Sequence, residues 1–341
     1  MKKPSISLNA VKSRWLITGV AGFIGSNLLN YLLKNDQYVV GLDNFSTGFE
    51  DNLEEVKKTV TKTQWSNFDF YQGDIRDLEV CNKCCRDVEY VLHQAALGSV
   101  PRSIENPRDT NDVNVVGFLN MLLASRDQRV KKMVYASSSS VFGDHPSMPK
   151  VEGREGNLLS PYAVSKYVNE LYAGVFALNY NLPLIGLRYF NVFGPRQNPY
   201  GPYAAVIPKW VEKIASGIKI EIYGDGNNSR DFCYVDNVVV ANILAAKSKN
   251  PSALNQAYNV AVGQRTRLKD LYRSMSDLFL KEFNIIACKP DFLEPRQGDV
   301  LHSHADISKA ESLLGYCPVV RVDEGLQKYI RWAFNQKVTK K

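Results

Sequence analysis

The stretch WLITGVAGFIG (residues 15–25) joins a short apolar run to three glycines and to the start of a second apolar segment. Gly19, Gly22 and Gly25 have a GxxGxxG spacing and lead into FIGSNLLNYLLKN, whose apolar residues recur at helical spacing. Glycine permits a tight turn between a strand and a helix, and it lets a pyrophosphate approach the amide groups at the helix N-terminus. The glycines in this context predict a dinucleotide-binding turn.

Further short apolar runs alternate with helical stretches through the first half of the chain. After the first strand, at 15–18, the predicted strands are residues 38–43, 69–74, 90–96, 132–138 and 183–190. This alternation is typical of an α/β fold with a doubly wound parallel sheet, the Rossmann arrangement. After Asn191 the chain becomes rich in Pro, Gly and Asn, which predicts a change to a smaller mixed α/β lobe. We therefore expect a dinucleotide-binding domain at 1–190, with a return segment around 232–263, and a second lobe at 191–341.

Acidic residues end the second and third predicted strands. Asp43 is placed to accept hydrogen bonds from both hydroxyls of an adenine ribose and to repel a 2′-phosphate, which favours NAD over NADP. Asp74 would lie near the adenine, although an aspartate at a strand end is also a common turn residue. Both interpretations of Asp74 stay open at this point.

The stretch SPYAVSKY (160–167) contains a tyrosine and a lysine four residues apart. Ser160 is a good N-cap and Pro161 suits the first helical turn, so Tyr162 and Lys166 share one face of a predicted helix. A lysine ammonium and the positive end of the helix dipole both favour tyrosinate, which would make Tyr162 a general base. The same spacing is common in ordinary amphipathic helices, so it decides nothing by itself.

Four serines, Ser137 to Ser140, lie at the C-terminal end of the fifth predicted strand in KMVYASSSSVFG. The carboxyl ends of the strands are where doubly wound sheets bind their ligands. A hydroxyl at that edge could relay a proton between a substrate and Tyr162. The serines therefore favour the functional interpretation of the tyrosine.

Composition excludes several other classes of protein. The net charge of +7 is spread along the chain, without the interleaved basic and aromatic residues of a nucleic-acid groove, and it suits an anionic small-molecule substrate. No apolar run has the length of a membrane span and the first residues lack a signal-peptide core, so we expect a cytoplasmic protein without a membrane partner. Neither the cluster Cys81, Cys84 and Cys85 nor the pair His302 and His304 has the spacing of a metal site, so none is expected.

The motifs along the chain resemble those of the extended short-chain dehydrogenase/reductase family. From about Trp15 to Gly325, the motifs that carry the resemblance are TGVAGFIG, Asp43, GDIRD, HQAA, SSSSVFGD, YAVSK, LRYFNVFGPRQ, RDFCYVDN and RQGDV. Within that family the chain is similar to nucleotide-sugar 4-epimerases, in particular the bacterial UDP-N-acetylglucosamine/UDP-N-acetylgalactosamine 4-epimerases of polysaccharide pathways. The resemblance implies NAD as cofactor, a UDP-sugar substrate held by the second lobe, and a homodimer built from helices near 107–128 and 161–180.

The resemblance also implies roles for individual residues. The catalytic residues would be Tyr162, Lys166 and one of Ser138 to Ser140, of which we favour Ser139. The cofactor-binding residues would be Gly19, Gly22, Phe23, Ile24, Gly25, Asp43, Asn44, Ser46, Thr47, Gly48, Asp74, Ile75, Gln94, Ala95, Ala96, Asn114, Tyr162, Lys166 and Val192. The substrate-binding residues would be Gly98, Ser99, Ser103, Ser138, Ser139, Ser140, Asn191, Ala205, Val206, Tyr223, Arg230, Arg296, Asp299 and Ser303, with the two arginines on the diphosphate.

One departure within the family narrows the reaction. Dehydratases that resemble this chain carry an Asp-Glu pair just after the Ser or Thr of the fifth strand, and the decarboxylases usually carry a glutamate there. Here serines and Val141 occupy those positions. The implied reaction is therefore oxidation and re-reduction at one carbon. Tyr162 takes the 4-OH proton directly or through Ser139, NAD takes the C4 hydride, the 4-keto sugar turns, and the hydride returns to the opposite face.

Two segments, residues 93–103 and 298–308, resemble those of the epimerases that act on N-acetylated sugars. In those relatives a small residue in the second segment leaves room for the acetamido group, and Ser303 fits that place. Leu301 stands where close relatives carry an arginine, which leaves the substrate preference open. We expect reversible C4 epimerisation of a UDP-N-acetylhexosamine or its uronic acid. The alternatives are a UDP-glucose/galactose or UDP-glucuronate 4-epimerase and, in a different class, a non-catalytic NAD-binding protein.

Overall fold

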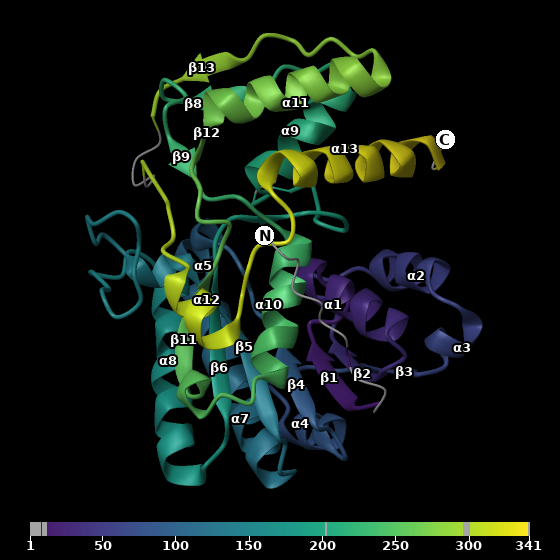
Figure 1. The fold of residues 1–341 in the computed structure, drawn as a ribbon, viewed down its shortest axis with the longest axis vertical. Helices are drawn as coiled ribbons and strands as arrows, with labels where there is room; N and C mark the ends of the chain where they lie inside the picture. The colour runs from purple at the N-terminus through teal and green to yellow at the C-terminus, as the bar shows by residue number, and fades with distance from the viewer. Residues whose placement is uncertain (1–7, 9–11, 202, 296–300, 340–341) are drawn as a thin grey trace.

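A seven-stranded parallel sheet forms the larger part of the molecule (Figure 1). The computed structural model describes residue 8 and residues 12–201, 203–295 and 301–339. The strand order is β11-β6-β5-β4-β1-β2-β3, and every neighbouring pair is parallel. The expected doubly wound α/β fold is thereby confirmed. The strands are β1 (Arg14–Thr18), β2 (Tyr38–Asp43), β3 (Phe68–Gln72), β4 (Tyr90–His93), β5 (Lys132–Ser138), β6 (Leu184–Tyr189) and β11 (Gln256–Val260).

Helices cover both faces of the sheet, which buries the strands on both sides. Along β1, Trp15 and Ile17 belong to the core on one face and Leu16 to the core on the other, as the alternation of strand side chains requires. The first face packs against α1 (Phe23–Lys34), α2 (Glu50–Thr59), α10 (Val235–Lys247) and α12 (Ser308–Leu314). The second face packs against α4 (Leu78–Cys85), α7 (Gly117–Asp127) and α8 (Pro161–Tyr180). Short helices within the connections are α3 (Lys62–Trp65), α5 (Val100–Glu105), α6 (Pro107–Asn111), the π-helix η1 (Asp112–Val116) and the 3-10 helices η2 (Ser139–Phe142) and η3 (Pro251–Ala253).

A smaller lobe stands over the carboxyl ends of the sheet strands (Figure 1). Its own core gathers aromatic side chains such as Trp210, Phe279 and Tyr329. Its strands are short: β8 pairs with β13 in parallel, β9 with β12 antiparallel, and β7 with β10 in parallel where the lobe joins the sheet domain. The elements are β7 (Val192–Phe193), α9 (Val206–Ala215), β8 (Glu221–Tyr223), β9 (Ser229–Arg230), β10 (Cys233–Tyr234), β12 (Thr266–Arg267), α11 (Leu268–Phe283), β13 (Asp291–Leu293) and α13 (Val322–Thr339).

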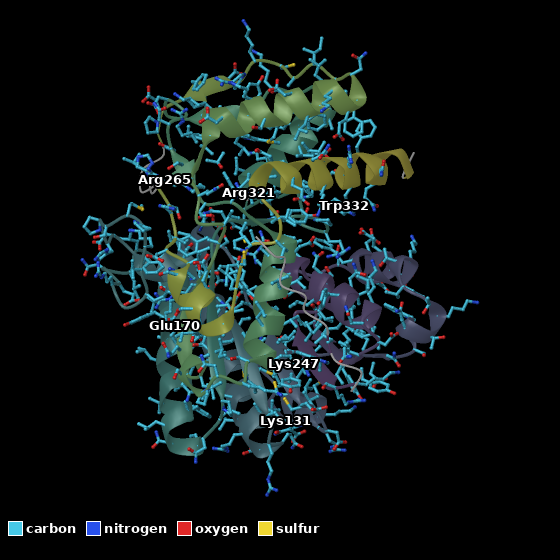
Figure 2. All side chains as sticks on the ribbon, viewed as in Figure 1. Lys131, Glu170, Lys247, Arg265, Arg321 and Trp332 are labelled. Atoms are coloured by element: carbon cyan, nitrogen blue, oxygen red, sulfur yellow. The ribbon has the colours of Figure 1, made fainter. Side chains whose placement is uncertain are left out.

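The strand order reverses at β1, which lies between β2 and β4. In doubly wound sheets the crevice at the carboxyl ends of the strands beside such a point is the usual ligand site. Figure 2 shows Lys131 and Lys247 at the opposite end of the sheet, away from the lobe. The crevice and the lobe therefore lie at the same end of the sheet.

Most of the predicted strands are confirmed, and those at 38–43 and 132–138 match β2 and β5 residue for residue. β3 and β4 are shorter than predicted because the chain leaves the sheet after Gln72 and His93 and turns into the loops at its carboxyl edge. β11, which falls within the return segment, adds the seventh strand. In the part of the chain that the structure describes, no helix has the length and apolarity needed to cross a membrane.

Candidate active site

The turn between β1 and α1 requires glycine at two positions for steric reasons. Gly19 has φ +68°, and a Cβ there would lie 2.8 Å from the amide nitrogen of Ala95. A Cβ on Gly25 would lie 2.0 Å from the carbonyl oxygen of Gly19. Gly22 is the N-cap of α1 and offers no side chain to cap the first turn, so the amide groups of that turn remain available to an anion. These features fit the pyrophosphate of a dinucleotide.

Asp43 lies at the end of β2, next to this turn. Its carboxylate accepts hydrogen bonds from the amides of Ala21 (2.9 Å) and Phe45 (2.8 Å), and only 7% of the residue is exposed. Burial raises the pKa of Asp43, and the backbone hydrogen bonds lower it in part. The carboxylate therefore stands where a ribose beside the pyrophosphate would reach it.

The loops after β2 and β3 are joined by Asp74. Its carboxylate accepts hydrogen bonds from Arg76 (2.7 Å) and from the side-chain amide of Asn44 (2.8 Å). The bond to Arg76 is the main reason why the pKa of Asp74 falls to about 2. Asp74 thus stabilises its own turn, as expected for a turn residue at a strand end. It also fixes Asn44, the residue after Asp43. The neighbouring cofactor predictions Ser46, Thr47 and Gly48 lie in the same loop between β2 and α2, and Ile75 is buried.

The end of β4 carries two polar side chains that face inward. His93 Nδ1 pairs with Thr18 Oγ1 at 2.8 Å, and burial together with Lys166 lowers the pKa of His93 to about 3, so the imidazole is neutral near pH 7. Gln94 accepts a hydrogen bond from Tyr189 OH (3.0 Å) and donates one to Asn242 (3.2 Å). These contacts fix the loop of Gln94, Ala95 and Ala96 against the glycine turn.

Asn114 lies in the π-helix η1, and its amide is fully used. It accepts a hydrogen bond from Leu97 N (2.8 Å), and its Nδ2 donates to Leu97 O (3.1 Å) and to Ser165 Oγ (3.1 Å). A π-helix contains one extra residue in a turn and is frequent at functional sites. Asn114 therefore ties the loop after β4 to α8.

The helix of the tyrosine and lysine begins as predicted. Ser160 accepts a hydrogen bond from the amide of Ala163 (3.1 Å), and α8 starts at Pro161. Lys166 is 2% exposed, and its Nζ donates to the carbonyl oxygen of Ala136 on β5 (2.9 Å). Burial lowers the pKa of Lys166 to about 8. Tyr162 and Lys166 thus face the carboxyl end of β5, where the serines lie.

The pKa of Tyr162 runs opposite to expectation. The sequence predicts that Lys166 and the helix dipole lower it, but burial raises it, and only the hydrogen bond to the Ser138 side chain acts in the other direction. The reason is that the site desolvates the phenol and the lysine together, which disfavours both charged forms.

The structure places Ser138, and not the favoured Ser139, against Tyr162. Ser138 is the last residue of β5, and its Oγ also accepts hydrogen bonds from the amide (3.1 Å) and the hydroxyl (2.9 Å) of Ser140. Ser139 is the first residue of η2, so the chain changes direction between the two serines. Of the serines after Ala136, Ser138 is therefore the one whose hydroxyl contacts Tyr162.

A buried ionic network behind these residues was not predicted. Glu170 follows Lys166 by one turn of α8 and accepts hydrogen bonds from Ser137 Oγ (2.5 Å) and from two nitrogens of Arg188 (2.6 and 2.9 Å). Arg188, on β6, also pairs with Glu155 at 2.6 Å. The network fixes α8, β5 and β6 against one another. The signal in the sequence was the four-residue spacing of Tyr162, Lys166 and Glu170.

The predicted substrate residues come from both domains. Gly98, Ser99 and Ser103 belong to the segment of α5, where Ser99 caps the helix (3.2 Å to the amide of Arg102) and Ser103 donates to the carbonyl oxygen of Val100 (2.7 Å). Asn191, with φ +33°, lies between β6 and β7. From the lobe come Ala205 and Val206 at the start of α9, Tyr223 in β8, Arg230 in β9, and Ser303. Arg296 and Asp299 lie outside the described residues.

The clustered cysteines lie in the core. Cys81, Cys84 and Cys85 are in α4, the helix after the third strand, and all three are buried. Burial raises the pKa of Cys84 to about 11. Among the residues that the structure describes, His, Cys, Asp and Glu side chains form no group of three or more that could hold a metal ion.

A glycine turn, a strand-end aspartate and a tyrosine–lysine pair at one edge of a doubly wound sheet define a site for dinucleotide-dependent hydride transfer. The chain belongs to the NAD dependent epimerase/dehydratase family, whose match covers residues 15–261. The expected family is thereby confirmed.

Three similar proteins cover nearly the whole chain. A UDP-N-acetylglucosamine 4-epimerase from Methanobrevibacter ruminantium M1, solved with UDP-N-acetylmuramic acid, is 36% identical with a TM-score of 0.86 over 95% of this chain and 99% of its own. The UDP-glucose 4-epimerase of Thermus thermophilus, solved with NAD, is 33% identical with a TM-score of 0.80 over 94% of this chain and 98% of its own. A UDP-glucuronate 4-epimerase of Thermodesulfobacterium geofontis is 31% identical over 332 residues, which are 94% of this chain and 95% of the relative. NAD as the cofactor and an NAD-dependent UDP-sugar 4-epimerase as the enzyme class are confirmed, while the relatives differ in the sugar they are named for.

Proposed function

We propose that this enzyme interconverts UDP-N-acetylglucosamine and UDP-N-acetylgalactosamine. The observation that carries the proposal is the small side chain of Ser303 beside the strand of Arg230. The amide of Ser303 donates to the carbonyl oxygen of Ser229 (2.9 Å), and Arg230 Nη1 donates to that of Leu301 (3.2 Å). A small residue there leaves space for an acetamido group next to the proposed diphosphate anchor. The likeness to the Methanobrevibacter ruminantium enzyme supports the same sugar.

In this proposal the proton passes through two residues of the chain, and a third residue supplies the charge that this transfer needs. NAD bound at the glycine turn would supply the hydride chemistry at C4, on one face of the sugar and then on the other. Tyr162 takes the proton of the 4-hydroxyl through Ser138, which stands here in place of Ser139, and later gives it back. Because burial raises the pKa of Tyr162, its ionisation requires a positive charge nearby. Lys166, with a pKa of about 8, is mostly protonated at pH 7 and supplies that charge.

The proposed division of labour assigns the cofactor to the sheet domain and the UDP-sugar to the lobe. Asn191 and Arg230 would hold the diphosphate, and Arg296 and Asp299 belong to the same proposal. Anchoring at the diphosphate leaves the hexose free to turn between the two hydride transfers. The remaining proposed contacts to the uridine and the sugar are Ala205, Val206, Tyr223, Gly98, Ser99 and Ser103.

A homodimer is part of the proposal, as are a cytoplasmic location and a role in polysaccharide biosynthesis. On α8, Leu171, Val175 and Leu178 are spaced along one face and are 54%, 54% and 82% exposed. A second copy of the chain would bury this apolar stripe. Leu178→Arg should convert a dimer into a monomer in light scattering, and a wild-type protein that already scatters as a monomer would end this part of the proposal.

The test of the substrate is direct. We expect purified protein incubated with UDP-N-acetylglucosamine to yield the galacto epimer, resolved by NMR. Turnover of UDP-glucose or UDP-glucuronate without turnover of the N-acetylated sugar would replace the proposed substrate. Bound NAD without turnover of any of the three would favour the non-catalytic alternative.

A further inference from the structure

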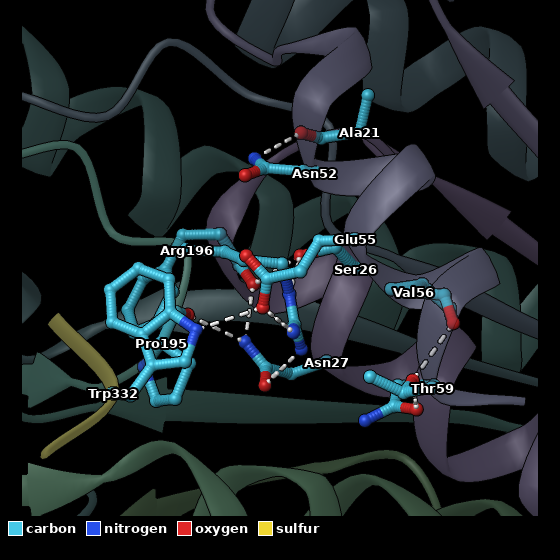
Figure 3. Close-up of polar contacts among 12 residues, drawn as sticks. Ala21, Ser26, Asn27, Asn52, Glu55, Val56, Thr59, Pro195, Arg196 and Trp332 are labelled. Carbon is cyan, nitrogen blue, oxygen red and sulfur yellow. Dashed lines mark hydrogen bonds and ion pairs between the residues drawn. The ribbon is translucent and has the colours of Figure 1, made fainter. Parts of the chain in front are cut away.

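Arg196 follows β7 in the motif NVFGPRQ and lies buried between the two domains (Figure 3). It is 7% exposed, and its backbone has φ +67°, a conformation that residues other than glycine rarely adopt. Its Nε donates to Ser26 (3.0 Å), its Nη1 to Glu55 (2.9 Å) and its Nη2 to Asn27 (2.5 Å). Each of the three guanidinium nitrogens therefore has a partner on helix α1 or α2 of the sheet domain.

The acceptors on α1 directly follow the glycine turn. Ser26 and Asn27 are the fourth and fifth residues of that helix, near its positive end, where a buried cation is unfavourable unless it is compensated. Glu55 supplies the compensating charge. Asn27 also donates to the carbonyl oxygen of Pro195 (3.0 Å), so the loop of Arg196 is attached to α1 by backbone as well as by side chain.

Glu55 also connects to the lobe. The same oxygen that accepts from Arg196 accepts a hydrogen bond from Trp332 Nε1 on α13 (2.9 Å; Figures 2 and 3). α13 contributes Leu326, Tyr329 and Ile330 to the core of the lobe, so it moves as part of the lobe. Trp332 therefore connects the lobe to α2 by a hydrogen bond.

The helix α2 in turn holds the glycine turn itself. Asn52 Nδ2 donates to the carbonyl oxygen of Ala21 (2.8 Å), and the amide of Phe49 donates to the same oxygen (3.1 Å). The lobe is thus linked to the phosphate-binding turn by two routes, through Glu55 and α2 to Ala21, and through Arg196 to α1.

We propose that Arg196, Glu55 and Trp332 form a joint that sets both the retention of NAD and the affinity for the uridine nucleotide. None of the three is placed among the residues that bind cofactor or substrate, so they act as positioning residues. If the joint is loosened, the lobe can shift on the sheet domain, and the binding of UDP becomes weaker. The glycine turn also loses its support from α1 and α2, and the binding of NAD becomes weaker.

The test uses two neighbouring residues of α13. Trp332→Phe removes the hydrogen bond to Glu55 and keeps an aromatic ring. Arg331→Gln is the matched control, because Arg331 pairs with Glu282 of α11 (2.7 Å) inside the lobe. NAD release is followed by rapid dilution of the holoenzyme and chromatography of the free nucleotide, and UDP binding is measured by calorimetry.

We expect Trp332→Phe to release NAD about 3- to 10-fold faster and to bind UDP weaker by a similar factor, with both constants unchanged in Arg331→Gln. Glu55→Gln, which keeps an acceptor but removes the charge that faces Arg196, should act in the same direction and tests the joint without changing the lobe. A Trp332→Phe protein with both constants within twofold of wild type, or a change in only one of them, would overturn the proposal. Equal effects of both α13 variants would also overturn it. Failure of the wild-type protein to bind UDP would instead contradict the substrate class.

Discussion

The sheet domain and the smaller lobe build their parts of the site in opposite ways. In the sheet domain the functional groups lie at the ends of buried strands or in the helices packed beside them, as Asp43 ends β2, Ser138 ends β5 and Tyr162 lies in the first turn of α8. In the lobe the strands have only two or three residues, and hydrogen bonds from side chains hold neighbouring segments together. Asp231, for example, is fully buried and accepts hydrogen bonds from the amides of Val262 and Gly263 (3.0 and 3.1 Å).

This difference suggests that the sheet domain carries out the reaction and that the lobe selects the sugar. Ser138 ends a strand of the sheet, and Tyr162 and Lys166 lie in the first turns of α8, which is tied to that strand by the bond from Lys166 to Ala136, so the three groups have little freedom to move. Residues of the lobe are fixed by a few local contacts, so their identity can change without disturbing the sheet. Substitutions at the sheet edge should therefore affect every sugar alike, and substitutions in the lobe should affect one sugar more than another.

The largest effect is expected for Tyr162→Phe. Loss of the proposed general base should lower kcat by about 10³-fold or more on every UDP-sugar tested. The NAD content of the purified protein should equal that of wild type, because the glycine turn and Asp43 are untouched. A variant that epimerised at the wild-type rate would show that another group takes the proton.

A smaller effect should distinguish the serines. Ser138→Ala should lower kcat by about 10²-fold, because it removes the hydroxyl that contacts Tyr162, whereas Ser139→Ala should stay within about threefold of wild type. Steady-state kinetics with the same sugar measures both. The reverse order would return the relay to Ser139.

In the lobe, Ser303→Tyr should change selectivity. We expect kcat/KM for UDP-N-acetylglucosamine to fall by about 10- to 50-fold and kcat/KM for UDP-glucose to stay within about threefold. Competition assays with both sugars in one tube give the ratio directly. An equal loss on both sugars would mean that the comparison between the two domains fails at this residue.

The smallest effect concerns stability. The pKa of Lys166 in the folded protein is about 8, below its value of about 10.4 in an unfolded chain. Between these values the unfolded chain holds the proton and the folded protein does not, so wild-type stability should rise by roughly 2 kcal/mol between pH 7.5 and pH 9.5. Lys166→Met should lack that rise and should be inactive. Thermal midpoints of the two proteins at pH 7.5 and 9.5, at equal NAD concentration, measure the difference. Parallel changes in the two midpoints would assign the effect to other groups.

The sequence predicted those residues whose place depends on local structure. Gly19 follows a strand, Asp43 ends a strand, and Lys166 lies near the start of a helix. The bounds of these elements can be predicted from apolar runs and from a helix N-cap. Ser138 was one of the three candidate serines, and the predicted strand 132–138 ends on it. Which of the three hydroxyls contacts Tyr162 depends on how α8 packs against β5, and that packing cannot be predicted from the sequence.

Long-range contacts account for the rest. Arg188 and Glu170 are 18 residues apart, and Arg196 and Ser26 are 170 apart. A pairing of this kind depends on how the elements pack. The raised pKa of Tyr162 has the same origin, since desolvation is set by everything that surrounds the phenol.

The π-helix that contains Asn114 has a consequence for how this chain tolerates changes in length. Its extra residue is what turns Asn114 toward Leu97 and Ser165. Deleting one residue from 112–116 would restore regular α-helical winding and remove the widened turn in which Asn114 lies. Conservative replacements within the segment would leave the winding in place. The π-helix therefore depends on the number of residues in the segment more than on their identity.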